Sequence, residues 1–336
     1  MYNEDMAFMY NSIKGVIPMQ IEPIFLTPIF QERIWGGTKL AERFGYSIPS
    51  PHTGECWAVS AHPNGQTVIK NGPFQGMTLG QLWEERRDLF GHFPSDRFPL
   101  LTKILDANAD LSVQVHPDDA YAQKHENGEL GKTECWYIID CKQGAELVYG
   151  HHAKTKEELK EMMEQGQWDK LLRKVPIKPG DFFYVPSGTM HALCEGTLVL
   201  ETQQSSDTTY RVYDYDRVDS NGKKRELHLD KAFDVITVPH RDAAVHPRVT
   251  QMDGAVVTTF IESDYFGVQK WEVDGTAEFE QTRHFLIVSI LAGQGELVSG
   301  ERSYILKKGD HFILPHQFGR FAIKGALEAI ASWPRA

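Results

Sequence analysis

Two histidine-containing stretches of this sequence have residue types and spacings that suit metal binding. In KPGDFFYVPSGTMHAL (178–193), an alternating aromatic strand runs into Pro186 and Gly188, and His191 follows soon after that glycine. Proline and glycine together end the strand and form a tight turn, which would aim the histidine. A lone histidine is more often a satisfied core residue, so a metal site requires partners elsewhere in the chain.

Candidate partners lie upstream, in LSVQVHPDD and KTECWYII. Gln114 and His116 are two residues apart in an alternating strand, so both side chains point to the same face. Glu134 begins a further predicted strand. Imidazole, carboxylate and amide groups together suit zinc or another borderline divalent cation. The sequence therefore predicts one metal site, formed by Gln114, His116, Glu134 and His191.

The same residues leave other interpretations open. His116 could be a turn residue, and Glu134 could pair with Lys132. In addition, His116, Glu134 and His191 make a set of two histidines and one carboxylate, which is typical of non-haem iron(II) oxygenases. Against that interpretation, Gln114 would occupy one of the coordination positions that such an oxygenase keeps open. Oxygen uptake with bound iron would favour the oxygenase.

The elements that must position these residues are mainly short strands rich in Val, Ile, Phe and Tyr, separated by Gly, Pro and Asp turns. A helix is predicted from Thr78 to Gly91, another from Thr155 to Gly166, and a third over 168–175. The first two begin with capping-box spacing, in which Gln or Glu follows threonine by three residues. We interpret these helices as packing elements around a β fold.

A weak internal repeat indicates two similar β units. The segment 178–186 (KPGDFFYVP) is echoed by 308–315 (KGDHFILP), with Gly and Pro at the same separation. The second copy continues with His316 and lacks the P-x-G-x-x-H ending, so its metal site is expected to be lost. The boundary is placed near Pro239 to Pro247. The predicted division is an N-terminal extension (1–18, with a possible natural start at Met19), a metal-binding catalytic domain (19–240) and a degenerate C-terminal domain (241–336).

Composition limits the class of protein. The chain has 336 residues, 41% hydrophobic and 24% charged, with a net charge of -11. The negative charge argues against nucleic-acid binding, and no apolar run approaches the length of a membrane span. Its four cysteines form no CxxC pair, which indicates a reduced, cytoplasmic protein. We expect a monomer or small homo-oligomer, in which a few placed cations would hold any anionic ligand.

Several motifs together resemble one family. The spacing G-x5-P-x-G-x2-H resembles the second motif of the cupin superfamily, whose jelly-roll barrels aim a histidine into the barrel mouth. PLLTKILDANADLSVQVHPDD, GKTECWYII, PSGTMHAL and ETQQSSDTTYRVYDYDR, in this order, resemble the type I mannose-6-phosphate isomerases in their shorter bacterial form. The resemblance extends from about residue 19 to the C-terminus and is weak in the last hundred residues. It implies a mainly β fold of two cupin-like jelly-roll barrels with a few helical insertions, the second barrel degenerate.

The resemblance also implies an activity and roles for residues. The activity is zinc-dependent interconversion of mannose 6-phosphate and fructose 6-phosphate, with the four predicted ligands holding one zinc ion per chain. The family's catalytic arginine falls on Arg211, and Lys132 and Asp207 are candidates to move the proton. Lys132 would need a pKa lowered towards neutrality. The remaining substrate-binding candidates are Lys103, Ser112 and Glu201, with the phosphate expected at Lys103 or another cation.

Two alternatives to these implied roles remain. Arg211 could form a surface ion pair with Asp207, Asp214 or Asp216, where such pairs contribute little. The whole chain could also be a sugar-phosphate-binding cupin without catalysis, which would bind tightly without turnover. A second metal site at His284, His311 or His316 is not expected.

Overall fold

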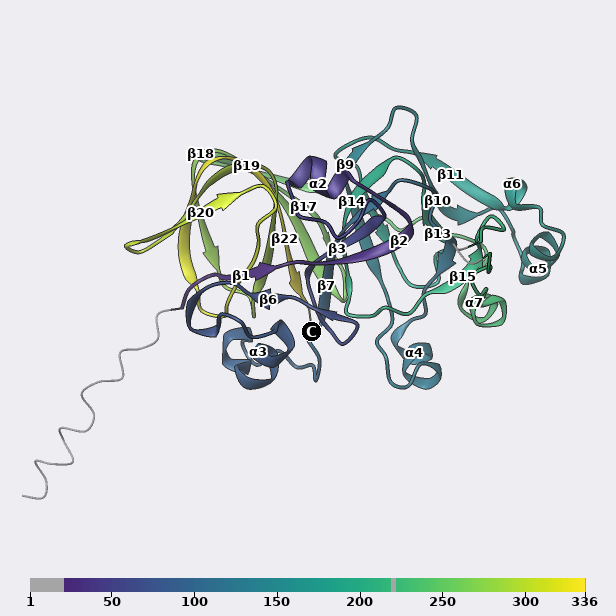
Figure 1. Cartoon of the computed structure of the whole chain (residues 1–336), viewed down its shortest axis with the longest axis horizontal. Coiled ribbons are helices and arrows are strands. Elements are labelled where there is room, and N and C mark those ends of the chain that lie inside the picture. The colour runs from purple at the N-terminus through teal and green to yellow at the C-terminus, as the bar shows by residue number, and fades with distance from the viewer. Residues whose placement is uncertain (1–20, 219–221, 336) are drawn as a thin grey trace, which may run out of the picture.

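The computed structural model describes residues 21–218 and 222–335, and its architecture is mainly β, as predicted. Figure 1 shows a lobe of long C-terminal strands beside a lobe that carries the shorter strands and most of the helices. The predicted N-terminal extension (1–18) and Met19 lie outside the described residues. Within the described parts of the chain, every helix is too short or too polar to cross a membrane.

The largest sheet has nine strands and forms the core of the C-terminal lobe. Its path runs β16 (Arg248–Met252), β17 (Ala255–Glu262), β18 (Phe266–Gln281), β22 (Gly319–Pro334), β19 (Leu286–Ser299), β21 (His311–Leu314), β1 (Ile24–Thr27) and β6 (Val68–Ile69), with β20 (Arg302–Lys307) paired to β19. Since β1 and β6 come from the N-terminal half, the two predicted domains share this sheet. The segment 236–247, which contains the predicted boundary, has no helix or strand. The domain limits themselves stay a prediction.

Two further sheets pack face to face in the other lobe. The five-stranded sheet has the order β11 (Leu172–Pro176), β10 (Glu146–His151), β13 (His191–Leu193), β8 (Val113–Val115), β15 (Tyr210–Tyr213). The six-stranded sheet has the order β12 (Phe182–Val185), β9 (Glu134–Cys141), β14 (Thr197–Gln204), β7 (Leu100–Ala107), β3 (Thr53–Val59), β2 (Ile29–Gly37). β4 (Ala61–His62) and β5 (Gly65–Gln66) form a separate hairpin. Side chains from both larger sheets, such as Trp136 and Leu147, share one apolar core, so the cupin-like lobe is a sandwich and not a closed barrel.

The helices cover the outside of these sheets. They are α2 (Lys39–Phe44), α3 (Leu79–Glu85), α4 (Asp119–His125), α5 (Lys156–Glu164), α6 (Trp168–Leu171) and α7 (Leu229–Val235), with 3-10 turns η1 (Gly72–Phe74) and η2 (Arg87–Phe90). The capping box predicted at Thr78 is present at the start of α3. The predicted helix breaks at Arg86 and reaches Gly91 only through η2.

The other two predicted helices differ in detail from the structure. Thr155 caps α5 by accepting a hydrogen bond from the Glu158 N–H, but the Glu158 carboxylate accepts from the Lys154 N–H, so the box is half formed. The helix predicted over 168–175 was wrong beyond its first turn. The chain leaves α6 as strand β11, because pairing with β10 satisfies its backbone groups at the edge of the five-stranded sheet.

The internal repeat corresponds to equivalent pieces of structure. Gly180 and Gly309 both have left-handed backbones, with φ of 91° and 88°, and each precedes a short strand, β12 or β21. Glycine adopts this conformation without the steric cost that a Cβ atom would bring. The two halves therefore repeat a glycine turn followed by a short strand, which is buried throughout only in β21.

Candidate active site and metal centre

The predicted metal ligands come together from both sheets of the sandwich. Gln114 in β8 pairs directly with His191 in β13, and Glu134 begins β9 in the facing sheet. Proline and glycine end the preceding strand because they form the turn that positions His191. Gly188 has φ of 82°, and its N–H donates to the carbonyl oxygen of His116 at 2.8 Å. The turn thus ties the two histidine segments to each other.

The ligand atoms converge on one point. The Nε2 atoms of His116 and His191 lie 3.5 Å and 3.3 Å from the two carboxylate oxygens of Glu134. One potential ligand atom from each of these three residues falls within 4.8 Å of the others. The side-chain amide of Gln114 approaches His191 Nε2 at 3.4 Å, and a half-turn of that amide directs its oxygen to the same point.

Hydrogen bonds and burial hold both imidazoles in the form that binds metal. Nδ1 of His116 lies 2.9 Å from the carbonyl oxygen of Thr208, and Nδ1 of His191 lies 2.8 Å from that of Thr189. Each Nδ1–H therefore donates to a backbone carbonyl, which leaves the Nε2 lone pair facing Glu134. Burial lowers the pKa of His191 to about 4 and, together with the positive charge of Lys132, holds the pKa of His116 well below its usual value.

The environment of Glu134 fits a cation at this point. Its side chain is fully buried, and Lys132 Nζ lies 3.0 Å from Oε2. Oε1 lies 3.3 Å from Nε2 of His191, whose lone pair cannot donate a hydrogen bond to it. Among the described residues Oε1 accepts no hydrogen bond, which is costly for a buried carboxylate oxygen. Two neutral imidazoles, a carboxylate and an amide oxygen are a donor set suited to zinc and similar divalent ions.

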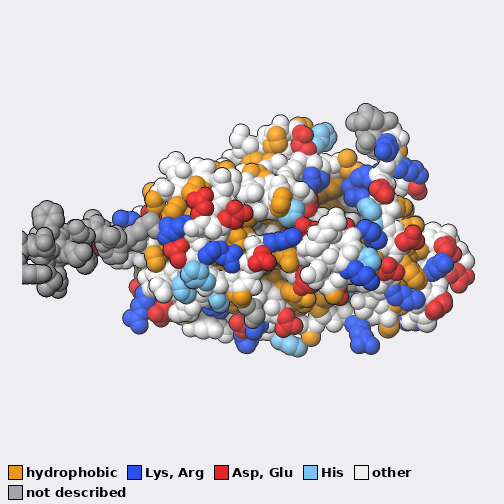
Figure 2. All heavy atoms as spheres, turned by 90° about the horizontal axis from the view of Figure 1, so that it is seen from below, with side chains coloured by type: hydrophobic (Ala, Val, Ile, Leu, Met, Phe, Trp, Pro, Cys, Tyr) orange, Lys and Arg blue, Asp and Glu red, His pale blue; other side chains and the backbone are white. Residues whose placement is uncertain are grey.

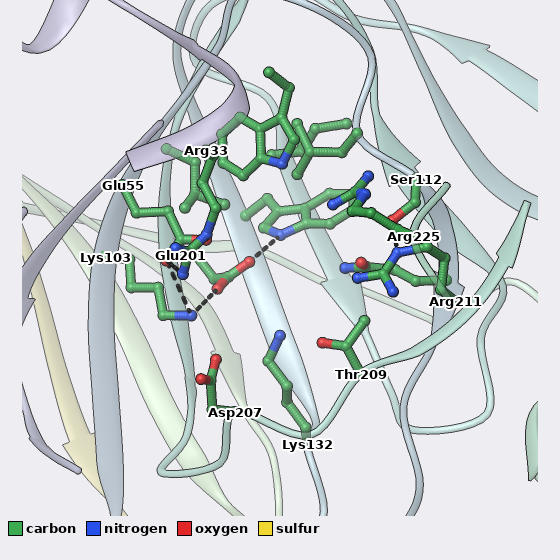
Figure 3. Close-up of a pocket in the computed structure, with 16 residues that line it drawn as sticks. Arg33, Glu55, Lys103, Ser112, Lys132, Glu201, Asp207, Thr209, Arg211 and Arg225 are labelled. Carbon is green, nitrogen blue, oxygen red and sulfur yellow. Dashed lines mark hydrogen bonds and ion pairs between the residues drawn. The ribbon is translucent and has the colours of Figure 1, made fainter. Parts of the chain in front are cut away.

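A cavity of about 400 Å³ adjoins this cluster, because Gln114 and Lys132 line the cavity and also contact His191 and Glu134. Every other residue that the sequence predicted for the site lines it, together with Gln114 (Figure 3). These residues are Lys103, Ser112, Lys132, Glu201, Asp207 and Arg211. Sequence reasoning missed three charged lining residues, Arg33, Glu55 and Arg225. No motif marks them, because Arg33 and Glu55 lie on separate strands and Arg225 follows β15 in an irregular segment.

One side of the cavity is a network of buried, mutually compensated charges. Arg33 donates two hydrogen bonds to Glu55, at 2.9 Å and 3.1 Å. Lys103 Nζ lies between Glu55 and Glu201, at 3.9 Å and 3.8 Å. Glu201 accepts from the indole N–H of Trp136, while burial and the charge of Glu134 raise its pKa. Lys103 is therefore largely neutralised by its neighbours.

The other side of the cavity carries positively charged arginines with fewer carboxylates close to them. Figure 3 shows Arg211, Arg225 and Ser112 together on this side. Arg211 Nε donates to the Ser112 hydroxyl at 3.3 Å, and Nη1 donates to the Glu226 carbonyl at 2.8 Å. Burial and the nearby Arg225 lower the pKa of Arg211, as expected where a cation meets another cation.

The three carboxylates considered as ion-pair partners of Arg211 interact with other residues instead. Asp214 binds Arg217 and Arg225, at 2.6 Å and 2.5 Å. Asp216 pairs with Lys224 at 2.6 Å, and Asp207 accepts a hydrogen bond from Asn64. Within residues 21–218 and 222–335, the guanidinium of Arg211 has neutral partners only. This arrangement leaves its charge available to a ligand.

The carboxylate neighbours of Lys132 raise its pKa, whereas proton abstraction would need a lowered pKa. Burial alone would lower the pKa of Lys132, but the charges of Glu134, Glu201 and Asp207 outweigh burial. A cation bound by Glu134 would weaken the first of these three charge effects.

The histidines of the C-terminal half have structural partners. His311 is buried, and its ring nitrogens contact the Tyr46 hydroxyl at 2.8 Å and the Ser289 hydroxyl at 2.9 Å. The rings of His284 and His316 lie 6.5 Å apart between centroids. Among the described residues, the only metal-binding cluster of histidine, cysteine and carboxylate side chains is that of His116, Glu134 and His191.

The fold and site define a cupin-type protein with a buried candidate metal centre beneath a charged cavity. Residues 24–139 match the family model for the catalytic domain of type I phosphomannose isomerase, and residues 256–334 match the cupin domain of mannose-6-phosphate isomerase. The chain is 59% identical to mannose-6-phosphate isomerase ManA of Bacillus subtilis over 94% of this chain and 99% of that protein.

Two other comparisons agree with these matches. Mannose-6-phosphate isomerase of Streptococcus mutans is 55% identical, over 93% of this chain and 98% of that protein. The crystal structure of mannose 6-phosphate isomerase from Bacillus subtilis superimposes with a TM-score of 0.92 and 58% identity, covering 93% of this chain and 99% of that one. The chain belongs to the type I mannose-6-phosphate isomerase family.

Proposed function

We propose that this protein is a zinc-dependent isomerase that interconverts mannose 6-phosphate and fructose 6-phosphate. The observation that carries the proposal is the buried cluster of His116, Glu134 and His191, which Gln114 and Lys132 connect to a cavity that Arg211 also lines. Family membership supports the substrate, and the nitrogen and oxygen donor set supports zinc. The four predicted ligands, Gln114 included, would hold one ion per chain.

The isomerisation moves a proton between C1 and C2 of the sugar, and negative charge develops on the oxygens of these carbons. A zinc ion held by the four ligands would supply Lewis-acid stabilisation of that charge. Arg211 pairs in register with Gln114, so its guanidinium approaches the same region from the neighbouring strand β15. A fixed cation in a site shielded from water stabilises developing charge efficiently. Arg211 is therefore assigned to the sugar oxygens.

The proton transfer is assigned to Asp207, with Lys132 as a charged partner. Both line the cavity, and Figure 3 places them along the same edge. Lys132 Nζ lies 3.0 Å from the predicted metal ligand Glu134, so we assign this ammonium group to stabilisation of an oxyanion and not to proton abstraction. The Asp207 carboxylate can accept the proton from one carbon and return it to the other.

The phosphate group is assigned to Arg225, with the Ser112 hydroxyl as a second donor. Arg225 lines the cavity on the side of Arg211, and its charge is shared with Arg217 through a single carboxylate, Asp214. Planar guanidinium groups bind phosphate oxygens with two hydrogen bonds each. Lys103, the first candidate from the sequence, is instead placed here as the cation that holds Glu55 and Glu201.

The experiment that tests this function is a coupled assay of the purified protein with mannose 6-phosphate, followed by detection of fructose 6-phosphate. We expect turnover with the phosphorylated sugar and none with free mannose. Tight binding without turnover would favour a sugar-phosphate-binding cupin. Oxygen consumption with bound iron would favour an oxygenase, and either result would contradict the proposal.

A further inference from the structure

The hairpin of β4 and β5 reaches the candidate active site from outside the cavity. Ala61 pairs with Gln66 and His62 with Gly65, which leaves Pro63 and Asn64 as the tip. The Asn64 side-chain amide donates a hydrogen bond of 2.9 Å to Oδ2 of Asp207, which is 143 residues further along the chain. Asp207 lines the cavity, whereas Asn64 does not.

The tip that carries Asn64 is held in place by its own hairpin. The backbone N–H of Asn64 donates to Nδ1 of His62 at 3.2 Å, and His62 is only 7% exposed. The imidazole packs edge-on against Trp57, with ring centroids 6.0 Å apart. Trp57 in turn donates to Glu55 in the charged network of the cavity. The Asn64 amide is therefore presented from a fixed support.

Close packing adds a second restraint on this hairpin. A Cβ atom on Gly65 would lie 2.3 Å from Cδ1 of Ile29 in β2, so glycine lets the hairpin pack closely against this side chain. The hydroxyl of Ser60 accepts a hydrogen bond from the His62 N–H at 3.2 Å. The tip thus has little freedom to move away from Asp207.

Asp207 needs such a restraint because it lies in the irregular segment between β14 and β15. Its neighbour Thr208 uses its carbonyl to orient the metal ligand His116, so a small displacement of the segment would affect both groups. The amide of Asn64 donates to Oδ2 of this carboxylate and so fixes one of its two acceptor oxygens.

We propose that Asn64 is a positioning residue for Asp207. It holds Oδ2 so that Oδ1 is directed at the carbon that loses the proton. This role rests on the proposed function, in which Asp207 transfers the proton, and it adds a residue that no local motif around the metal ligands indicates. Asn64 itself does not touch the substrate.

The test compares Asn64→Ala and Asn64→Asp with the wild type in the mannose 6-phosphate assay. We expect kcat to fall about tenfold in Asn64→Ala, since a hydrogen bond to a charged group contributes on that order. KM should change little, because Asn64 does not line the cavity. Asn64→Asp should lose more, because its carboxylate would repel Asp207 instead of donating to it. Pro63→Ala, at the same exposed tip, is the matched control and should retain wild-type kcat.

A double-mutant cycle separates positioning from a general effect on folding. In an Asp207→Asn background, Asn64→Ala should cause no further loss of kcat, because its effect acts through that carboxylate. An equal loss of kcat in both backgrounds would overturn the inference, as would wild-type kcat in Asn64→Ala. Failure of the wild type to turn over mannose 6-phosphate would overturn both this role and the proposed function, so the two failures are distinguishable.

Discussion

Replacing Arg211 with lysine tests whether this residue stabilises the transition state or only binds the substrate. The guanidinium is fixed by the Ser112 hydroxyl at 3.3 Å and the Glu226 carbonyl at 2.8 Å, and its remaining donors are free of carboxylates. Lysine keeps the positive charge but replaces the planar fork by a single ammonium on a flexible chain. Arg211→Lys therefore removes the planar arrangement of hydrogen-bond donors and retains the positive charge.

The expected magnitude follows from the guanidinium donors that lysine cannot replace at the reacting oxygens. Loss of one preorganised donor typically lowers kcat by about a hundredfold, or about 2.7 kcal/mol of transition-state stabilisation. Since the interaction is assigned to the transition state, kcat and kcat/KM should fall by similar factors. The two hydrogen bonds that now fix Arg211 are expected to be lost as well, which would add to the decrease.

The assay is steady-state kinetics on mannose 6-phosphate, with metal content measured in both forms so that loss of the ion is excluded. A rise in KM with kcat nearly unchanged would refute the reasoning. It would move Arg211 to the phosphate and leave Lys132 and Asp207 as the groups that act on C1 and C2.

Three other predictions test separate parts of the site and fold. Arg225→Met should raise KM for mannose 6-phosphate by about ten- to a hundredfold with kcat little changed, because it removes hydrogen bonds to the charged phosphate. His116→Ala and His191→Ala should lose bound metal and activity together, by elemental analysis and assay, whereas His316→Ala should change neither. In denaturant titrations, His311→Gln should weaken the pH dependence of unfolding, because it removes a buried histidine whose pKa is lowered to about 3.

The sign of the last effect follows from where the protons bind. Burial lowers the pKa of folded His311 to about 3, and an unfolded histidine titrates near ~6.5. The unfolded state therefore binds more protons between these values, and stability falls as the pH drops through the window. At about pH 5 the loss from this residue is on the order of 2 kcal/mol. Since His116 and His191 shift in the same direction, only the difference between wild type and variant isolates His311. An identical pH dependence in both would contradict the prediction.

The residues of the candidate metal site were predictable because local chemistry marks each of them. Gln114 and His116 share a face by strand periodicity, and the breakers before His191 predict a turn. The structure shows why the turn matters, since Gly188 binds the His116 backbone. The sequence alone does not show that Glu134 lies close to Gln114, His116 and His191, because that proximity depends on how the second sheet packs across the core.

The residues missed by sequence reasoning owe their positions to long-range packing. Arg33 and Glu55 meet across the pairing of β2 with β3, and Arg225 reaches the cavity through its ion pair with Asp214. The direction of the Lys132 pKa shift also follows from long-range packing. This pKa depends on Glu201 as well as Glu134, and no spacing in the sequence indicates that Glu201 lies nearby.

The distribution of charge over the protein could not be predicted from its composition. A net charge of -11 argues against a polyanionic partner, yet the active cavity carries local positive charge from Arg211 and Arg225. On the face seen in Figure 2, basic and acidic side chains are interspersed over the surface. In the proposed function, a phosphorylated sugar would therefore be attracted by a few arginines in a cavity and not by the protein as a whole.

The most direct test of the account is to titrate zinc into metal-free protein while measuring turnover of mannose 6-phosphate. The metal is first removed with a chelator, and its absence is checked by elemental analysis. The account predicts that activity is lost with the metal and returns in proportion to added zinc, reaching its maximum at one ion per chain. Full turnover by protein shown to contain no metal would contradict the account.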